Sequence, residues 1–363
     1  MMPRCHAFAN LCCLVVAGWL VAAGTTHAQP PSPPFEPSKA NVARLRWLHY
    51  KLVAGRIVAT SSYPEGMNIS FGPSVVDGRL REQLQLLILK NQASVRYELS
   101  GDGNELTIGM SEAGEFQVRR SRHNPRLSFQ FVQPPGKPVS LSVAEGDEQR
   151  IVSGTSFWHL YLAEPQWIAA ELIPYLELLR PTWKLAATGT AVEDTLIQRA
   201  QTSQTHDTRR WAQLVAQLAS SNFAERQRAE RELTRIGQVV LPFLGDLKTD
   251  QLDAEQAARV DRLISTLSVD YEDTVDRVAT WLAGDQQVWL SLLSRPEIAK
   301  RKVATAQLAA LTGGPIQFDP LADEPTRQAQ LITLRLRLGS SERRLLPPPD
   351  GTLDSVPPPG IER

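Results

Sequence analysis

Six short segments between positions 95 and 153 show the two-residue periodicity of β-strands, and only brief connections separate them. These connections contain turn-forming residues, as in Ser100–Gly103 and Pro134–Gly136. Because a parallel crossover needs about a dozen residues or more, connections this short allow only antiparallel hairpins. We therefore predict an antiparallel β-meander. Its strands are Val95–Leu99, Leu106–Met110, Phe116–Arg120, Leu127–Val132, Val139–Val143 and Arg150–Ser153.

Alternating strands leave one face of a sheet apolar, so this meander needs helices to cover it. The spacing of leucine and valine predicts helices over Ser38–Val53 and Gly78–Lys90. A third helix is predicted over Pro165–Leu179. After Thr155 no segment has a clear strand pattern. The expected fold class is therefore α+β, with a sheet-and-helix domain over 38–182 followed by an all-α region.

The first 28 residues have the layout of a secretory signal peptide, with a basic start, the apolar run Leu11–Ala23 and a small-x-small motif ending at Ala28. The apolar run is too short to favour a membrane-spanning helix. We therefore expect an exported protein, periplasmic or extracellular, with no transmembrane segment after cleavage. All three cysteines lie within this signal, which excludes disulfides and thiol chemistry from the mature chain.

Proline-rich sequence flanks the mature chain at both ends. Residues 29–37 are expected to form a disordered tether and 339–363 a disordered tail. The 39 basic and 39 acidic residues give a net charge of zero. Such a balance provides no overall attraction to nucleic acid, so we expect no nucleic-acid partner.

One helical sequence occurs twice, 75 positions apart, in the C-terminal half. Each copy has apolar residues on one stripe, and Gly237 or Gly313 follows it. Six matches at one offset indicate a structural repeat. The matched pairs are Phe223 and Ile298, Ala224 and Ala299, Arg226 and Arg301, Ala229 and Ala304, Leu233 and Leu308, and Ile236 and Leu311.

The helix with alanine followed by leucine, the glycine break and the proline-bearing partner helix at Leu233–Pro242 resemble HEAT-type α-solenoid repeats. The resemblance covers roughly Trp211–Leu338, although 251–293 lacks the full signature. It implies stacked helix pairs with a protein-binding surface, and it implies no catalytic residue. We accordingly assign 211–338 to a HEAT-like helical domain and 183–210 to a connector.

Two groups of arginines are candidate binding residues. The first lies at a predicted hairpin tip, where it either holds an anionic partner or forms a solvated sheet edge that discourages aggregation. The second occupies matched positions of the repeat, as a shared binding ridge or as arginines whose stems pack along the helix. The groups are Arg119, Arg120, Arg122 and Arg126, and then Arg226 and Arg301.

The sequence contains no phosphate-binding glycine loop, nucleophile elbow or zinc-protease motif. We therefore predict no catalytic residue, cofactor or metal site. The acidic cluster Asp270, Glu272, Asp273 and Asp276 is interpreted as offsetting a helix dipole rather than as binding a cation. His159 is expected to be hydrogen-bonded where the sheet meets the helices.

The predicted function is that of an exported, non-catalytic interaction protein that binds another envelope or secreted protein through its helical repeat surface. Two alternatives stay open. One is a ligand- or lipid-binding module whose pocket lies in the sheet domain. The other is a hydrolase with a site built from His159, Glu164 and the sheet. The oligomeric state is also left open.

Overall fold

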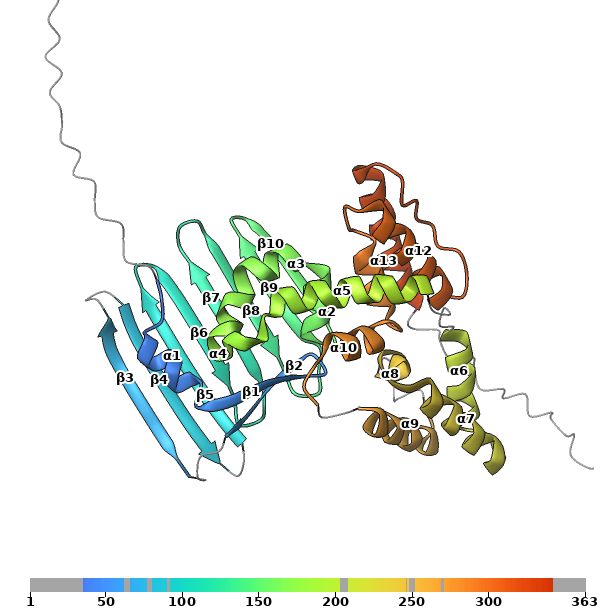
Figure 1. Cartoon of the computed structure of the whole chain (residues 1–363), viewed down its shortest axis with the longest axis horizontal. Coiled ribbons are helices and arrows are strands. Elements are labelled where there is room, and N and C mark those ends of the chain that lie inside the picture. Colours follow the sequence, from blue (N-terminus) through green and yellow to red (C-terminus); the bar gives the residue numbers. More distant parts are fainter. Residues whose placement is uncertain are drawn as a thin grey trace, which may run out of the picture. The chain divides into compact units, whose positions relative to one another are not determined.

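The computed structural model describes residues 35–61, 66–76, 80–89, 92–202, 208–245, 247, 252–268 and 271–341. The predicted signal peptide, residues 29–34 of the tether and 342–363 of the tail lie outside the described residues. Strands come first along the chain and helices follow (Figure 1). This arrangement confirms the predicted α+β class.

An antiparallel sheet of eight strands, β3 to β10, follows the order of the sequence, so each strand pairs with the next. All six predicted strands are present. β3 and β4 extend the sheet at its N-terminal edge. The strands are β3 (Asn68–Val76), β4 (Leu80–Leu89), β5 (Gln92–Gly101), β6 (Asn104–Met110), β7 (Phe116–Arg122), β8 (Leu127–Gln133), β9 (Val139–Glu145) and β10 (Glu148–Gly154).

The helix predicted over Ser38–Val53 is wrong for most of its length. Only α1 (Lys39–Leu45) is helical, and β1 (Leu48–Val53) follows it. β1 pairs with β2 (Arg56–Ser61) as a separate two-stranded ribbon. The ribbon is joined to the sheet because the Gln133 side chain accepts from the Ile57 N–H at 2.7 Å and donates to the Ile57 carbonyl at 2.8 Å.

The helix predicted over Gly78–Lys90 is also wrong, since its described residues form β4. Leu80 and Leu84 suggested a helix, but a spacing of four residues places side chains on one side of a strand as well. β4 alternates between the two faces of the sheet, with Leu80, Leu84 and Leu86 buried and Arg81 exposed. Two periodicities therefore fit the same leucines, and pairing with β3 and β5 selects the strand.

Helices cover the apolar face of the sheet together with the β1–β2 ribbon (Figure 1). They are α2 (Phe157–Ala163), α3 (Pro165–Trp167) and α4 (Ile173–Leu179). A π-helical turn, Ile168–Leu172, separates α3 from α4 within the predicted helix. Pro174 lacks the N–H that an α-helical bond would require, which accounts for this irregularity.

The rest of the described chain contains helices and turns but no strand. α5 lies within the segment predicted as a connector, yet it packs against α10 and α12 and buries Val192 and Leu196. No helix of the described residues has both the length and the apolar character needed to cross a bilayer. The helices are α5 (Leu185–Thr202), α6 (Thr208–Gln217), α7 (Phe223–Ile236), α8 (Leu241–Gly245), α9 (Ala254–Leu267), α10 (Val275–Leu282), α11 (Gln286–Leu292), α12 (Ile298–Leu311) and α13 (Glu324–Ser341).

The sequence repeat corresponds to two helical hairpins, α6–α7 and α11–α12. The second helix of each hairpin begins at the matched residue, Phe223 or Ile298. A glycine with positive φ follows each of these helices, at +77° for Gly237 and +70° for Gly313. The two copies therefore share their boundaries as well as their sequence pattern.

The two hairpins lie in different hydrophobic cores. The first packs with α8 and α9 in a cluster that includes Leu233 and Val260. The second shares the core of the sheet and of α2 and α5, where Leu308 is fully buried. We expected the repeats to cover one another in one stack, and the structure instead divides them between two cores.

Candidate binding surfaces

The four arginines of the predicted hairpin tip do not form one patch. Alternation along β7 places Arg119 on the open face of the sheet and Arg120 on the covered face. Arg120 is buried, and its Nε donates to the Tyr175 hydroxyl at 2.9 Å while its guanidinium stacks over the Phe35 ring. Arg120 thus fixes the first described residues of the chain against α4 and the sheet.

The other two arginines of that group are separate from Arg119 as well. Arg122 lies 3.8 Å from the Glu171 carboxylate, on the covered side. Arg126 is exposed in the turn between β7 and β8. Only Arg119 and Arg126 therefore present their charge mainly to solvent.

Arg226 and Arg301 bind the turns of their own hairpins. Arg301 is buried and donates to the carbonyls of Arg295 and Pro296, at 2.8 and 2.6 Å. Arg226 donates to the carbonyls of Ser220 and Ser221, at 2.6 and 3.1 Å. These contacts give both side chains a structural role, so the structure brings them to equivalent places but not to one surface.

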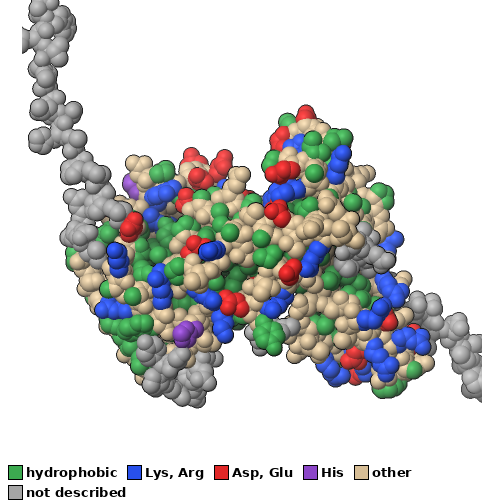
Figure 2. Space-filling model, viewed as in Figure 1, with side chains coloured by type: hydrophobic (Ala, Val, Ile, Leu, Met, Phe, Trp, Pro, Cys, Tyr) green, Lys and Arg blue, Asp and Glu red, His purple; other side chains and the backbone are tan. Residues whose placement is uncertain are grey.

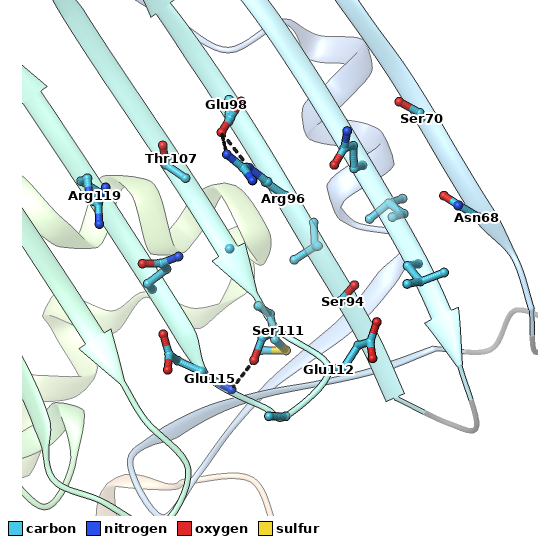
Figure 3. A pocket seen from close by; sticks show the side chains of 18 residues that line it. Asn68, Ser70, Ser94, Arg96, Glu98, Thr107, Ser111, Glu112, Glu115 and Arg119 are labelled. Carbon is cyan, nitrogen blue, oxygen red and sulfur yellow. Dashed lines mark hydrogen bonds and ion pairs between the residues drawn. The ribbon is translucent and has the colours of Figure 1, made fainter.

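The open face of the sheet is polar and contains a hollow of about 920 Å³ across β3 to β7 (Figure 3). Short side chains such as Ser94, Ser70 and Gly109 line it beside longer ones. A Cβ on Gly109 would lie no closer than 3.5 Å to any neighbouring atom. This glycine is therefore not required by packing within the sheet, and its missing side chain leaves space in the hollow.

The charged groups of this hollow are partly paired. Arg96 and Glu98, both on β5, form an ion pair of 2.6 Å (Figure 3). Glu112 and Glu115 lie on the β6–β7 turn at one end, and Arg119 lies on the neighbouring strand, β7 (Figure 3). Apolar side chains such as Leu87 and Met110 also line the hollow, but its hydroxyl, amide and charged groups suit a hydrophilic ligand better than an acyl chain.

A second hollow, of about 530 Å³, lies between α7 and α9, and we call it the α7–α9 groove. Phe223 lies at the start of α7 with 61% of its surface exposed. Lys and Arg side chains gather over this part of the molecule, with acidic ones among them (Figure 2). The groove is lined by Phe223, Gln227, Glu230, Arg231, Thr234, Arg259 and Arg262.

The buried centre of the molecule contains a serine, a histidine and an aspartate in contact. The Asp285 carboxylate accepts from His159 Nε2 at 2.7 Å, and Ser156 Oγ lies 2.9 Å from His159 Nδ1. Burial alone would raise the pKa of Asp285, but the charge and hydrogen bond of His159 lower it below its usual value. His159 is therefore hydrogen-bonded, as predicted, and its bond to Asp285 joins α2 to the N-terminus of α11.

Ser156, His159 and Asp285 are the residue types of a hydrolase triad, but the Ser156 hydroxyl has no open space in front of it for a substrate. A Cβ added to Gly55 would lie 2.6 Å from Ser156 Oγ, so the β1–β2 turn closes over the hydroxyl. Ser156 also caps α2 by accepting from the Trp158 N–H. Glu164 lies at the other end of α2, as its C-cap. The geometry favours a structural link over a nucleophile, which needs an open approach to its oxygen.

Two residues of the acidic cluster, Glu272 and Asp273, hold the β1–β2 ribbon and the helices together. Asp273 accepts from the Gly55 N–H and from Trp158 Nε1, both at 2.7 Å. Burial raises the pKa of Asp273 above its usual value, although these hydrogen bonds oppose the shift. Glu272 pairs with Arg180 at 2.5 Å. Asp270 lies outside the described residues, and the described ranges contain no group of three or more His, Cys, Asp or Glu side chains placed to hold a metal ion.

Comparison with protein-family models, with curated proteins and with solved structures returned no match. The assignment of function therefore depends on the geometry of the chain itself.

Sequence reasoning did not find the two hollows. The sequence marks Phe223 only as a repeat position, because a large apolar residue at the start of a helix is normally buried. Gly109 gave no indication of a hollow, since a glycine inside a strand usually marks a bulge or a close approach of another backbone or ligand. Whether Phe223 and Gly109 are exposed depends on which side chains the tertiary fold packs beside them.

Proposed function

We propose that the chain is a non-catalytic interaction protein that binds another protein through the α7–α9 groove. The observation that carries this proposal is the exposed Phe223 ring at one end of a groove lined with arginines. Aromatic and arginine side chains dominate the binding energy of protein interfaces, because both provide large contact areas.

Site-specific photo-crosslinking tests this proposal. A photoreactive phenylalanine analogue is placed at position 223 of the full chain, or at Tyr271 as the control. Tyr271 is a suitable match because it is 67% exposed and its ring lies 5.5 Å from the Arg277 guanidinium, much as Phe223 lies 5.7 Å from Arg226. In an extract of the producing cells, position 223 should give one discrete adduct that excess unlabelled protein suppresses. Equal adducts from both positions would contradict the proposal.

We also propose that the protein is exported, on the basis of the signal-like residues 1–28. Cleavage after Ala28 would leave Gln29 as the first residue. N-terminal sequencing of the protein from its own cells is the direct measurement. A mature chain that retains Met1 would overturn export by this signal.

A second candidate function is the binding of a hydrophilic ligand on the open face of the sheet, favoured by the polar hollow there. Native mass spectrometry of the full chain measures whether a small molecule is retained. Gly109→Leu should reduce that retention, because the new side chain fills the hollow. Gly136→Leu is not a usable control, since Gly136 has a φ of +62°. Ser142→Leu, on the open side of β9 outside the hollow, serves instead.

A further inference from the structure

We infer that the partner segment bound in the α7–α9 groove is acidic and carries an apolar side chain about two helical turns from its carboxylates. This inference rests on the proposed function and adds the chemistry of the partner. Its basis is the charge of the groove, the position of the exposed ring and a comparison with the second hairpin.

The charge of the groove is positive at its rim. Glu230 is the one carboxylate of the lining, and it pairs with Arg259 at 2.6 Å in the half-buried floor. Arg262 lies 3.7 Å from the same carboxylate but keeps 64% of its side chain exposed. Arg231 is exposed, and none of the acidic side chains in the described part of the chain pairs with it. Arg259 also pairs with Glu255 at 2.7 Å, outside the lining. Arg231 and Arg262 are therefore the two arginines of the lining that face solvent, and Arg262 shares Glu230 with Arg259.

The distance between the Phe223 ring and Arg231 sets the distance between the two groups of the ligand that contact them. Phe223, Gln227 and Arg231 follow one another at intervals of four residues, so they lie along one side of α7. The eight positions from Phe223 to Arg231 correspond to about 12 Å along the helix axis. A ligand that contacts both needs its apolar group and its carboxylates about that far apart, which two turns of helix or about four extended residues provide.

The second hairpin retains the exposed apolar position but not the charge. Ile298 occupies the place of Phe223 and is 48% exposed. Ala306 stands at the position that matches Arg231. The structural arginine is kept in both copies, as Arg226 and Arg301, whereas the rim arginine occurs only in the first. The chain thus distinguishes a residue that holds the hairpin from one that is free to contact a partner.

Fluorescence anisotropy with a synthetic peptide tests the inference. The probe is a fluorescein-labelled helical peptide of about 16 residues, built from glutamate, alanine and one leucine placed about two turns from a glutamate cluster. The full chain should bind it, with an affinity that falls as salt is raised. A peptide with lysine in place of glutamate should not bind.

Variants locate the binding. Arg231→Glu combined with Arg262→Glu should weaken binding by about tenfold or more, because like charges then face each other. Arg81→Glu combined with Arg335→Glu makes the same change in net charge at exposed positions outside the groove, and it should leave binding unchanged. Phe223→Ala should also weaken binding, whereas Ile298→Ala should not.

The outcomes separate this inference from the proposed function. Equal binding by the groove variant and its control, or equal binding of the acidic and basic peptides, overturns the acidic partner. If position 223 still crosslinks to a protein in that case, the proposed function stands and only the chemistry of the partner is wrong. If neither crosslinking nor peptide binding is found, both are wrong.

Discussion

Arg226 and Arg301, 75 positions apart, donate the same pair of hydrogen bonds to the turns of two helical hairpins. In each hairpin the accepting carbonyls belong to the residues six and five positions earlier. The copies differ at Nε. In Arg301 it donates to the Pro320 carbonyl at 2.9 Å, whereas in Arg226 it is buried without a partner. The repeat in sequence is therefore a repeat of one structural contact, completed in the second copy only.

Arg301→Ala should lower the free energy of unfolding by about 2–3 kcal/mol, because several charge-assisted hydrogen bonds are lost and carbonyls are left without donors. Arg226→Ala should cost less, about 1 kcal/mol, since its Nε has no partner to lose. Urea unfolding of both variants measures the difference. A larger loss in the Arg226 variant would contradict this account.

Asp285→Ala should destabilise the protein by about 3 kcal/mol at neutral pH, because it removes a buried partner of His159 and the cap of α11. The pKa of Asp285 is lowered in the folded chain, so its charged form stabilises the fold above the usual value of 3.8. That contribution is lost as the pH falls through the lowered pKa. The difference between wild type and variant should therefore shrink as the pH falls below about 4. A difference that grows on acidification is the contrary result.

Asp273→Asn should destabilise the protein less than Asp273→Ala does at neutral pH. The amide oxygen can still accept from Gly55 and Trp158 and the variant carries no buried charge, although the amide NH2 then replaces Oδ1, which is buried without a partner. Because the pKa of Asp273 is raised, protonation favours the folded state as the pH falls through it. The wild type should therefore gain stability relative to the Asp273→Asn variant on acidification. Thermal unfolding from neutral to mildly acidic pH checks this, with Asp273→Ala as a destabilised reference.

The sequence correctly predicted the elements whose residue pattern fits only one type of secondary structure. The six strands from Val95 to Ser153 were found because their turns leave no room for another connection. β1 and β4 were missed because leucines four apart, such as Leu80 and Leu84, satisfy helical and extended spacing alike. In both cases tertiary pairing decides between two local solutions, and a single sequence does not contain that information.

The candidate surfaces were less predictable than the fold. Arg119 and Arg120 are neighbours in sequence, yet the strand turns one to solvent and buries the other. Likewise, Asp285 was not connected with His159, since 126 positions separate the two and no motif links them. The partners of a polar side chain depend on long-range packing, which residue type and spacing leave undetermined.

The two hydrophobic cores should unfold separately, and two matched leucines test this. Leu233 and Leu308 occupy the same place in the repeat and are both fully buried, so each change to alanine should cost about 2–5 kcal/mol. Leu233 belongs to the core of α6 to α9, whereas Leu308 shares the core of the sheet. In native-state hydrogen exchange, Leu233→Ala should reduce protection in α6, α7 and α9 while leaving the strands unchanged. Leu308→Ala should reduce protection in the strands and in α5. Equal loss of strand protection in both variants would show that the cores unfold as one unit.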